Sequence, residues 1–120
     1  MKKVEEKAYA KINLVLNIGD LRPDGYHDIQ TIMQSLELHD DVTVEQTGGT
    51  GITVTASVDT IPTDESNLAV KAVKAFAAKT GVPADGLSIH IEKRIPVAAG
   101  LGGGSSDAAA TLRVLNVLYE

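Results

Sequence analysis

A run of glycine residues directly before a helix-forming segment is the feature of this sequence with the clearest chemical meaning. Four of the five residues from Gly100 to Gly104 are glycine, and Ser105, Ser106 and an alanine-rich stretch follow them. Glycine lets backbone N–H groups approach the oxygen atoms of a polyphosphate, because no side chain blocks the approach. A helix that begins after such a loop adds its free N–H groups and the positive end of its dipole. We therefore expect an anion-binding site here.

The same residues also have a purely structural interpretation, in which Ser105, Ser106 or Asp107 caps an ordinary helix after a flexible loop. The immediate succession of strand, glycine loop, paired serines and helix favours the anion site. Two common phosphate motifs do not fit. No Gly-Lys-Ser/Thr follows, which excludes a Walker A loop, and Ser105 replaces the third glycine of a dinucleotide-binding G-x-G-x-x-G.

The composition predicts one domain in a reducing compartment. The chain has 120 residues, a net charge of −5 and no cysteine. The negative charge gives little attraction for nucleic acid or anionic membranes, and the lack of cysteine excludes disulfides and thiolate metal sites. No apolar run is long enough for a signal peptide or a membrane span. We expect a cytoplasmic protein with no nucleic-acid or membrane partner.

Hydrophobic alternation predicts the strands that must position the loop. The segment 21–28, which contains Pro, Asp and Gly, predicts a turn between the first two strands, and 47–51 predicts a hairpin turn. We therefore expect a sheet built largely from neighbouring strands. The predicted strands are 12–18, 29–37, 42–47, 52–58 and 87–94.

Two helices complete the predicted elements. Ser66 is the expected cap of a helix that ends at Gly81, with apolar residues at Ala69, Ala72, Val73, Phe76 and Ala77. A second helix is expected from about Gly104, with an apolar stripe of Ala108, Leu112, Leu115 and Tyr119. No stop signal precedes Glu120, so we expect the sequence to be the front part of a longer protein.

Two blocks of sequence resemble the GHMP kinase family. The stretch PVAAGLGGGSSDAAA, residues 96–110, resembles the phosphate-binding motif of that family. The stretch AYAKINLVLNIGDLRPDGYHDIQTIMQSLELHD, residues 8–40, resembles the amino-terminal signature of one branch of it. The resemblance extends along the whole chain and is least distinctive over 45–64.

The resemblance implies an α+β fold, like the second domain of ribosomal protein S5, with a mostly antiparallel sheet packed with helices. This chain would cover most of that amino-terminal domain and none of the carboxy-terminal domain. The implied activity is ATP-dependent phosphorylation of the 2-hydroxyl of a cytidine diphosphate derivative of methylerythritol, in isoprenoid precursor synthesis. Mg²⁺ would be carried by the nucleotide, and the partners would be ATP and this small substrate.

The resemblance also implies roles for individual residues. Lys11 would contact the reacting hydroxyl and a neighbouring acid, and Asn13 would bind a substrate hydroxyl. Tyr26 would stack on cytosine while His27 forms a hydrogen bond to it. Without the resemblance, Lys11 and Asn13 would be interpreted as residues on a solvated face of a strand. Tyr26 and His27 would be interpreted as partly buried anchors of a loop. The expected nucleotide-binding residues are Asn67 and Leu68, near adenine, and Pro96, Val97, Ala98, Ala99, Gly100, Leu101, Gly102, Gly103, Gly104, Ser105 and Ser106, around the phosphates.

The remaining histidines have no predicted chemistry. We expect His39 in a loop and His90 on the outward side of a strand. No group of His, Asp and Glu has metal-ligand spacing, so we predict no metal site formed by the protein itself.

The carboxylate that would accept the proton of the substrate hydroxyl has no matching position in this sequence. The resemblance places it after Glu120, and neither Asp24, Asp28 nor Asp107 corresponds to it. We therefore predict little or no turnover by the 120-residue chain alone. Two alternatives stay open: a non-catalytic module that forms a homodimer through exposed surface, and another small-molecule GHMP kinase, such as a mevalonate or homoserine kinase. The block RPDGYH argues against the second.

Overall fold

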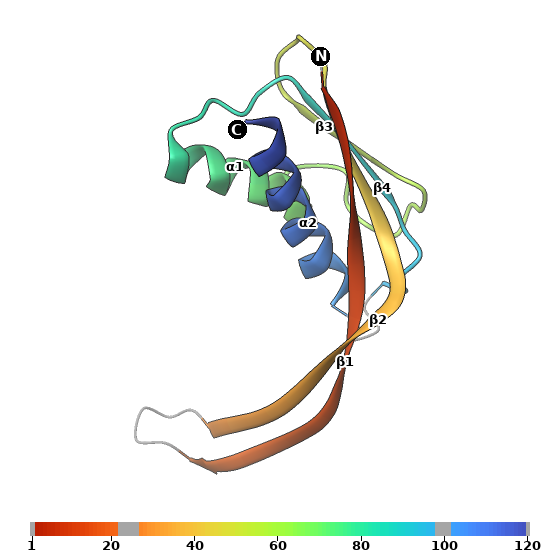
Figure 1. Cartoon of the computed structure of the whole chain (residues 1–120), viewed down its shortest axis with the longest axis vertical. Helices are drawn as coiled ribbons and strands as arrows, with labels where there is room; N and C mark the ends of the chain where they lie inside the picture. The colour runs from red at the N-terminus through yellow and green to blue at the C-terminus, as the bar shows by residue number, and fades with distance from the viewer. Residues whose placement is uncertain (1, 22–26, 98–101, 120) are drawn as a thin grey trace.

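Two helices lie on one face of a four-stranded sheet, which is the predicted α+β fold (Figure 1). The computed structural model describes residues 2–21, 27–97 and 102–119, and for residues 12–21 and 27–34 it describes the backbone alone. The strands are β1 (Lys3–Leu21), β2 (His27–Gln46), β3 (Ile52–Ala56) and β4 (Leu87–Glu92), and the helices are α1 (Leu68–Thr80) and α2 (Gly103–Leu118).

Strands β1 and β2 form a long antiparallel hairpin that extends beyond the helices and bends toward the side on which they lie (Figure 1). The predicted break between 29–37 and 42–47 is wrong, because β2 continues through it. Between Tyr9 and Lys11 the strand β1 advances two residues while β2 advances four, from His39 to Ser35. Such a bulge bends a strand pair and redirects its side chains. His39 therefore lies in β2, and its prediction as a loop residue is wrong.

The order of the strands is β1-β2-β4-β3, so β4 lies between β2 and β3. The prediction that residues 47–51 join two paired strands as a hairpin turn is therefore wrong. Strand β3 pairs in parallel with β4, while β2 pairs with β4 antiparallel. A parallel pair needs a crossover connection, and α1 provides it. Two of the three strand pairs are antiparallel, as expected.

Helix α1 begins one residue later than predicted. Asn67, and not Ser66, is its amino-terminal cap, because the Asn67 side chain accepts a hydrogen bond from the N–H of Ala69 at 2.8 Å. The hydroxyl of Ser66 instead donates to Asp64 at 2.6 Å. The predicted end at Gly81 is confirmed.

Helix α2 turns a different face toward the sheet than predicted. Leu115 is buried as expected, but Leu112 is 39% exposed, so the predicted stripe is wrong. The buried face contains the polar residues Asp107 and Thr111. A prediction that follows apolar residues alone cannot identify this face. Its full set is Asp107, Ala110, Thr111, Val114, Leu115 and Leu118.

The hydrophobic core lies between the sheet and the two helices. Strands β2 and β4 contribute Val42, Val44, Ile89 and Ile91, and the helices contribute residues such as Val73 and Val114. Helix α2 packs against β1, β2 and α1.

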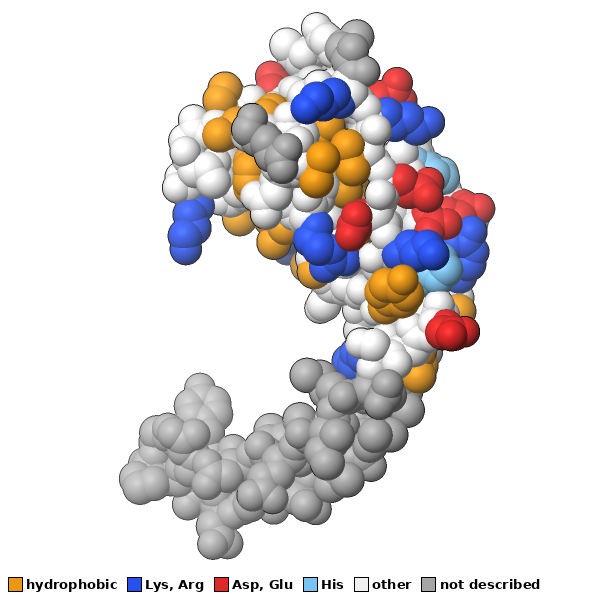
Figure 2. Space-filling view, in the orientation of Figure 1, with side chains coloured by type: hydrophobic (Ala, Val, Ile, Leu, Met, Phe, Trp, Pro, Cys, Tyr) orange, Lys and Arg blue, Asp and Glu red, His pale blue; other side chains and the backbone are white. Residues whose placement is uncertain are grey.

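Several large apolar side chains of the helices stay at the surface, where hydrophobic side chains gather over the helical part of the molecule (Figure 2). They are Leu68 of α1 and Leu112 and Val117 of α2. No helix within the described ranges is long and apolar enough to cross a membrane.

Candidate functional site

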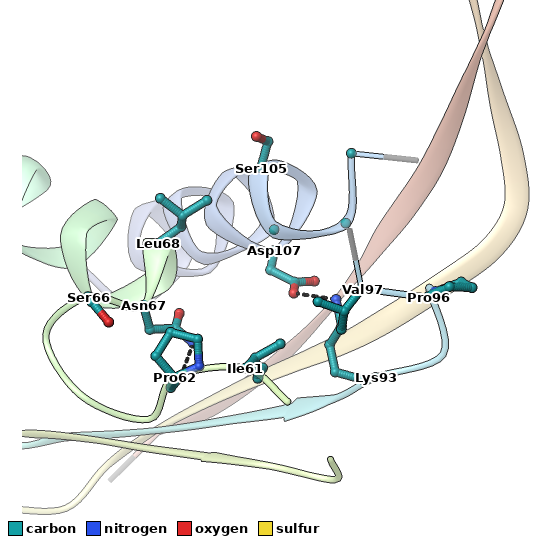
Figure 3. A pocket seen from close by; sticks show the side chains of 13 residues that line it. Ile61, Pro62, Ser66, Asn67, Leu68, Lys93, Pro96, Val97, Ser105 and Asp107 are labelled. Atoms are coloured by element: carbon teal, nitrogen blue, oxygen red, sulfur yellow. Dashed lines mark hydrogen bonds and ion pairs between the residues drawn. The ribbon is translucent and has the colours of Figure 1, made fainter. Parts of the chain in front are cut away.

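A cavity of about 360 Å³ lies between the amino ends of the two helices (Figure 3). Its volume falls in the range of small-molecule sites. One wall comes from the segment that leads into α1, and the other from the segment after β4 and the first turns of α2. The lining residues are Ile61, Pro62, Ser66, Asn67, Leu68, Lys93, Pro96, Val97, Gly102, Gly103, Gly104, Ser105 and Asp107.

The amino end of α2 has a glycine cap, and among the described residues no side chain accepts a hydrogen bond from its N–H groups. Gly102 is the cap residue, with φ of 71°, and its carbonyl accepts a helical hydrogen bond from the N–H of Ser106 at 2.9 Å. The interpretation in which Ser105, Ser106 or Asp107 caps α2 is therefore wrong. N–H groups in the first turn of a helix have no acceptor within it, and they can donate to an anion.

Two of the glycines are also required by close packing. A Cβ atom at Gly102 would lie 2.9 Å from Cε of Lys11, in a left-handed conformation that other residues rarely adopt. A Cβ atom at Gly103 would lie 3.0 Å from Cγ2 of Ile95 and 3.1 Å from Nζ of Lys93. Because these two glycines have no side chain, Lys11 and Lys93 can lie close to the start of α2.

Lys11 reaches this site from β1, although 91 residues separate it from Gly102. It follows the bulge in the β1–β2 hairpin, and its aliphatic stem packs against Gly102. The structure therefore brings the predicted catalytic lysine to the predicted phosphate loop.

Asp40 is a fully buried carboxylate that binds the segment leading to the glycine loop. Its Oδ1 accepts hydrogen bonds from the backbone N–H groups of Arg94, at 2.7 Å, and Ile95, at 2.9 Å. Its Oδ2 accepts a hydrogen bond from Nζ of Lys93 at 2.6 Å. This one side chain therefore fixes the end of β4 to β2.

Lys93 joins Asp40 to a second buried carboxylate, that of Asp107 in α2. The distance from Nζ of Lys93 to Oδ2 of Asp107 is 3.1 Å, and the Lys93 side chain is 4% exposed. The dashed line in Figure 3 marks this contact. Oδ1 of Asp107 is buried and has no hydrogen-bond partner among the described residues. We call Asp40, Lys93 and Asp107 the buried charge cluster.

The pKa values of the two carboxyl groups in this cluster are shifted in opposite directions. Burial and the neighbouring Asp40 raise the pKa of Asp107 to about 7, and Lys93 only partly opposes them. Burial alone would raise the pKa of Asp40 too, but the Asp107 carboxyl, the N–H groups of Ile95 and Arg94, and Lys93 outweigh burial and lower it. Burial likewise opposes the charge of Lys93, but both carboxyl groups hold its pKa above the ordinary value. At neutral pH, Asp40 is the ionised member of the carboxyl pair and Asp107 is near its midpoint.

Most predicted nucleotide-binding residues within the described ranges line the cavity, and Ser106 is the exception. The amide of Asn67 is already engaged: besides capping α1, its Nδ2 donates to the Pro62 carbonyl at 2.7 Å. Leu68 is half-exposed beside the cavity. Tyr26, Ala98, Ala99, Gly100 and Leu101 lie outside the described residues, as do the side chains of Asn13 and His27.

Sequence reasoning missed Asp40, Lys93, Ile61 and Pro62. His90 faces outward on β4, as predicted, where it contacts Thr55. Within the described part of the chain, no three His, Asp or Glu side chains are grouped as metal ligands.

Comparisons with known proteins point to the same family as the motifs. Residues 67–120 match the family described as GHMP kinases N terminal domain. A crystal structure of 4-(cytidine 5'-diphospho)-2C-methyl-D-erythritol kinase superposes with a TM-score of 0.83 at 40% identity, over 97% of this chain and 41% of that one. The fold is that of a GHMP kinase amino-terminal domain.

Curated relatives agree with the structural match. The 4-diphosphocytidyl-2-C-methyl-D-erythritol kinase of Lachnoclostridium phytofermentans is 49% identical over 114 residues, which is 95% of this chain and 39% of that enzyme. The enzyme of the same name from Caldicellulosiruptor bescii is 51% identical over 114 residues, or 95% of this chain and 40% of that enzyme. The chain resembles the amino-terminal part of these GHMP kinases and spans about two fifths of their length.

Proposed function

We propose that the chain is the ATP-binding part of a kinase that phosphorylates the 2-hydroxyl of 4-diphosphocytidyl-2-C-methyl-D-erythritol for isoprenoid precursor synthesis in the cytoplasm. The observation that carries the proposal is the uncapped amino end of α2 next to Lys11. Relatives that share about half of its residues have names that specify this substrate. This chain spans about two fifths of the length of those relatives, and we expect the complete reaction to need residues from the remaining part of such a protein.

The residues that line the cavity fit the parts of ATP. The N–H groups in the first turn of α2, which have no acceptor within the helix, would donate to phosphate oxygens, and the helix dipole would favour the negative charge of the phosphates. The apolar side chains of Ile61, Leu68 and Val97 would cover the base. Mg²⁺ that arrives with the nucleotide would neutralise further phosphate charge, and no protein carboxylate is assigned to it.

Lys11 would stabilise negative charge that develops during phosphoryl transfer, because its side chain lies against the start of α2. The roles of Asn13, Tyr26 and His27 toward the substrate rest on the resemblance alone. We expect little or no turnover by the 120-residue chain, because the proton-accepting carboxylate is expected beyond Glu120. Normal substrate-dependent ATP consumption by this chain would contradict that expectation.

Calorimetric titration with the magnesium complex of a non-hydrolysable ATP analogue tests the nucleotide site. The unmodified chain should bind it, and Gly102→Val should weaken binding at least tenfold, because the new side chain collides with Lys11. Gly81→Val is the matched control: it puts the same side chain at a residue of similar φ, 75°, at the opposite end of α1, where a Cβ atom meets nothing within 4 Å, and should leave affinity unchanged. Equal loss in both variants, or no binding by the folded unmodified chain, would overturn the assignment.

A chimera tests the substrate. This chain would replace the corresponding 114 residues of the Lachnoclostridium phytofermentans relative. The chimera should phosphorylate the cytidine diphosphate substrate, and Lys11→Met should reduce kcat about a hundredfold or more. Mevalonate and homoserine serve as rival substrates. Faster phosphorylation of either one would overturn the proposed specificity.

The exposed apolar side chains of α2 support a second candidate function, a self-associating module without catalysis. Leu112 and Val117 are 39% and 44% exposed, and apolar surface of this kind is often buried in a contact with another domain or a second copy. Light scattering of the chain distinguishes the two functions. A dimer that Leu112→Ser dissociates would support self-association, and a monomer at all concentrations would exclude it.

A further inference from the structure

The buried charge cluster contains one positive group and two acidic ones. Lys93 lies between Asp40 at 2.6 Å and Asp107 at 3.1 Å, and all three side chains are at most 4% exposed. Asp40 has further donors in two backbone N–H groups, whereas Oδ1 of Asp107 is buried with no partner among the described residues. A buried oxygen without a hydrogen bond is costly when it carries charge. Asp107 is therefore the member of the pair on which a proton is held most easily.

The cluster lies directly beneath the proposed phosphate site. Asp107 lines the same cavity as Gly102, Gly103 and Gly104, and a Cβ atom at Gly103 would lie 3.1 Å from Nζ of Lys93. The charged groups that face Asp107 are Asp40 from β2 and Lys93 from the segment after β4. Lys11 from β1 lies against Gly102, and the amino end of α1 contributes Asn67 and Leu68 to the cavity without adding charge.

The net charge of the cluster depends on one proton. With Asp107 protonated, the charges of Asp40 and Lys93 cancel. With Asp107 ionised, the cluster carries one negative charge in a poorly screened interior. A polyphosphate at the start of α2 repels that charge, so binding of the anion and protonation of Asp107 must favour each other.

We propose that Asp107 is a positioning residue of the phosphate site that takes up and holds a proton when a polyphosphate binds, while Lys93 and Asp40 fix it beneath α2. The inference rests on the proposed nucleotide site and adds a residue and a proton to it. The pKa of Asp107, about 7, places the uptake in the neutral range. At pH values below that range, Asp107 already holds the proton before the anion binds. At higher pH values, Asp107 takes up a proton from solvent when the anion binds.

The test compares the unmodified chain with Asp107→Asn, which keeps the shape of the protonated side chain and cannot ionise. The magnesium complex of the non-hydrolysable ATP analogue is titrated into both proteins from about pH 6 to about pH 8.5. The ratio of the two affinities removes the ligand's own ionisation. We expect equal affinities at about pH 6 and about tenfold weaker binding by the unmodified chain at about pH 8.5. Asp41→Asn is the control: Asp41 follows Asp40 in β2 but lies on the other face of the sheet, and this variant should follow the unmodified chain.

Calorimetry in buffers of different ionisation enthalpy gives the proton directly. The unmodified chain should take up about half of one proton per ligand near pH 7.5, and Asp107→Asn should take up less by that fraction. If the role of Asp107 were purely structural, Asp107→Asn would bind the ligand more weakly than the unmodified chain at every pH. Proton uptake would then be the same in both proteins.

The outcomes separate this inference from the proposed nucleotide site. Binding with a constant affinity ratio and equal proton uptake would overturn the role of Asp107 and leave the site intact. No binding by either protein would overturn the site and this role together. If Asp107→Asn does not fold, carbon NMR of the Asp107 carboxyl in the unmodified chain decides. Its titration midpoint should rise by about one unit with saturating ligand, and an unchanged midpoint would overturn the inference.

Discussion

The amino ends of the two helices line one cavity, but they are built in opposite ways. Helix α1 is closed by Asn67, whose side chain accepts from the N–H of Ala69 and donates to the Pro62 carbonyl. Helix α2 begins at Gly102, which has no side chain to close it. A side-chain cap of the first kind stabilises a helix by about 1 kcal/mol relative to alanine, whereas a glycine cap is only a few tenths of a kcal/mol less stable than the side-chain cap and leaves donors for a ligand.

The difference continues beneath the two helix ends. The residue after the α1 cap is the apolar Leu68, whereas α2 has the buried charge cluster below its first turns. The cluster holds the segment before the glycine loop through Asp40 and holds α2 through Asp107. The comparison teaches that α2 is positioned by buried ion pairs rather than by a cap, which leaves its amino end open.

The largest predicted effect on stability comes from removing Asp40 from the buried charge cluster. Asp40→Ala removes the acceptor of two backbone N–H groups and leaves Lys93 with one partner, so it should lower the free energy of unfolding by about 3 to 5 kcal/mol. Asp41→Ala, next to it but on the outer face of the sheet, removes a contact with the exposed Arg94 and should cost less than about 1 kcal/mol. Urea unfolding measures both. Similar losses in the two variants would mean that the cluster does not support the site.

A pH-dependent effect of intermediate size comes from Asp107. Its pKa is raised in the folded state to about 7, so between about pH 4 and pH 7 the folded chain binds more protons than the unfolded chain. Stability therefore falls as pH rises through this range. Relative to Asp107→Asn, the unmodified chain should lose about 2 to 3 kcal/mol between about pH 5 and pH 8. Parallel stability curves, measured by urea unfolding at each pH, would show an ordinary carboxyl group.

The pattern of apolar residues already contained the signal for this cluster. Lys93 comes directly after β4, at the position that continues the inward series of Leu87, Ile89 and Ile91, and its side chain is buried like theirs. Asp40 holds the same relation to Val42 and Val44 in β2. A charged residue at an inward position predicts a buried partner, because an unpaired buried charge is too costly to retain. The sequence alone does not say which partner, because the partners lie 53 and 14 residues from Lys93.

The strand order was harder to predict for a related reason. Local alternation identified β3 and β4, but their parallel pairing depends on the crossover through α1 and not on any adjacent turn. The loop–helix junction, in contrast, was predictable because glycine spacing and helix periodicity are local. The proximity of Lys11 to the start of α2 was not predictable, because it depends on the bulge between Tyr9 and Lys11. Neither the composition of the sequence nor its hydrophobic periodicity indicates that bulge.

The smallest predicted effect compares the two helix ends directly. Asn67→Ala removes the α1 cap and should cost about 1 to 2 kcal/mol of stability. Ser105→Ala, in the first turn of α2, caps nothing and should change stability by less than about 0.5 kcal/mol. Thermal unfolding gives both values. A larger loss for Ser105→Ala would show that α2 is capped after all.

The most direct test of the central claim follows the backbone N–H signals of both helix ends by NMR as the magnesium complex of a non-hydrolysable ATP analogue is added to the 120-residue chain. If α2 is the open end, the N–H signals of Gly103, Gly104 and Ser105 shift strongly and saturate together. The N–H of Ala69, which is already bonded to Asn67, should keep its hydrogen bond and shift little. Shifts centred on Ala69 and its neighbours, or no saturable shift at Gly103 to Ser105, would contradict the account.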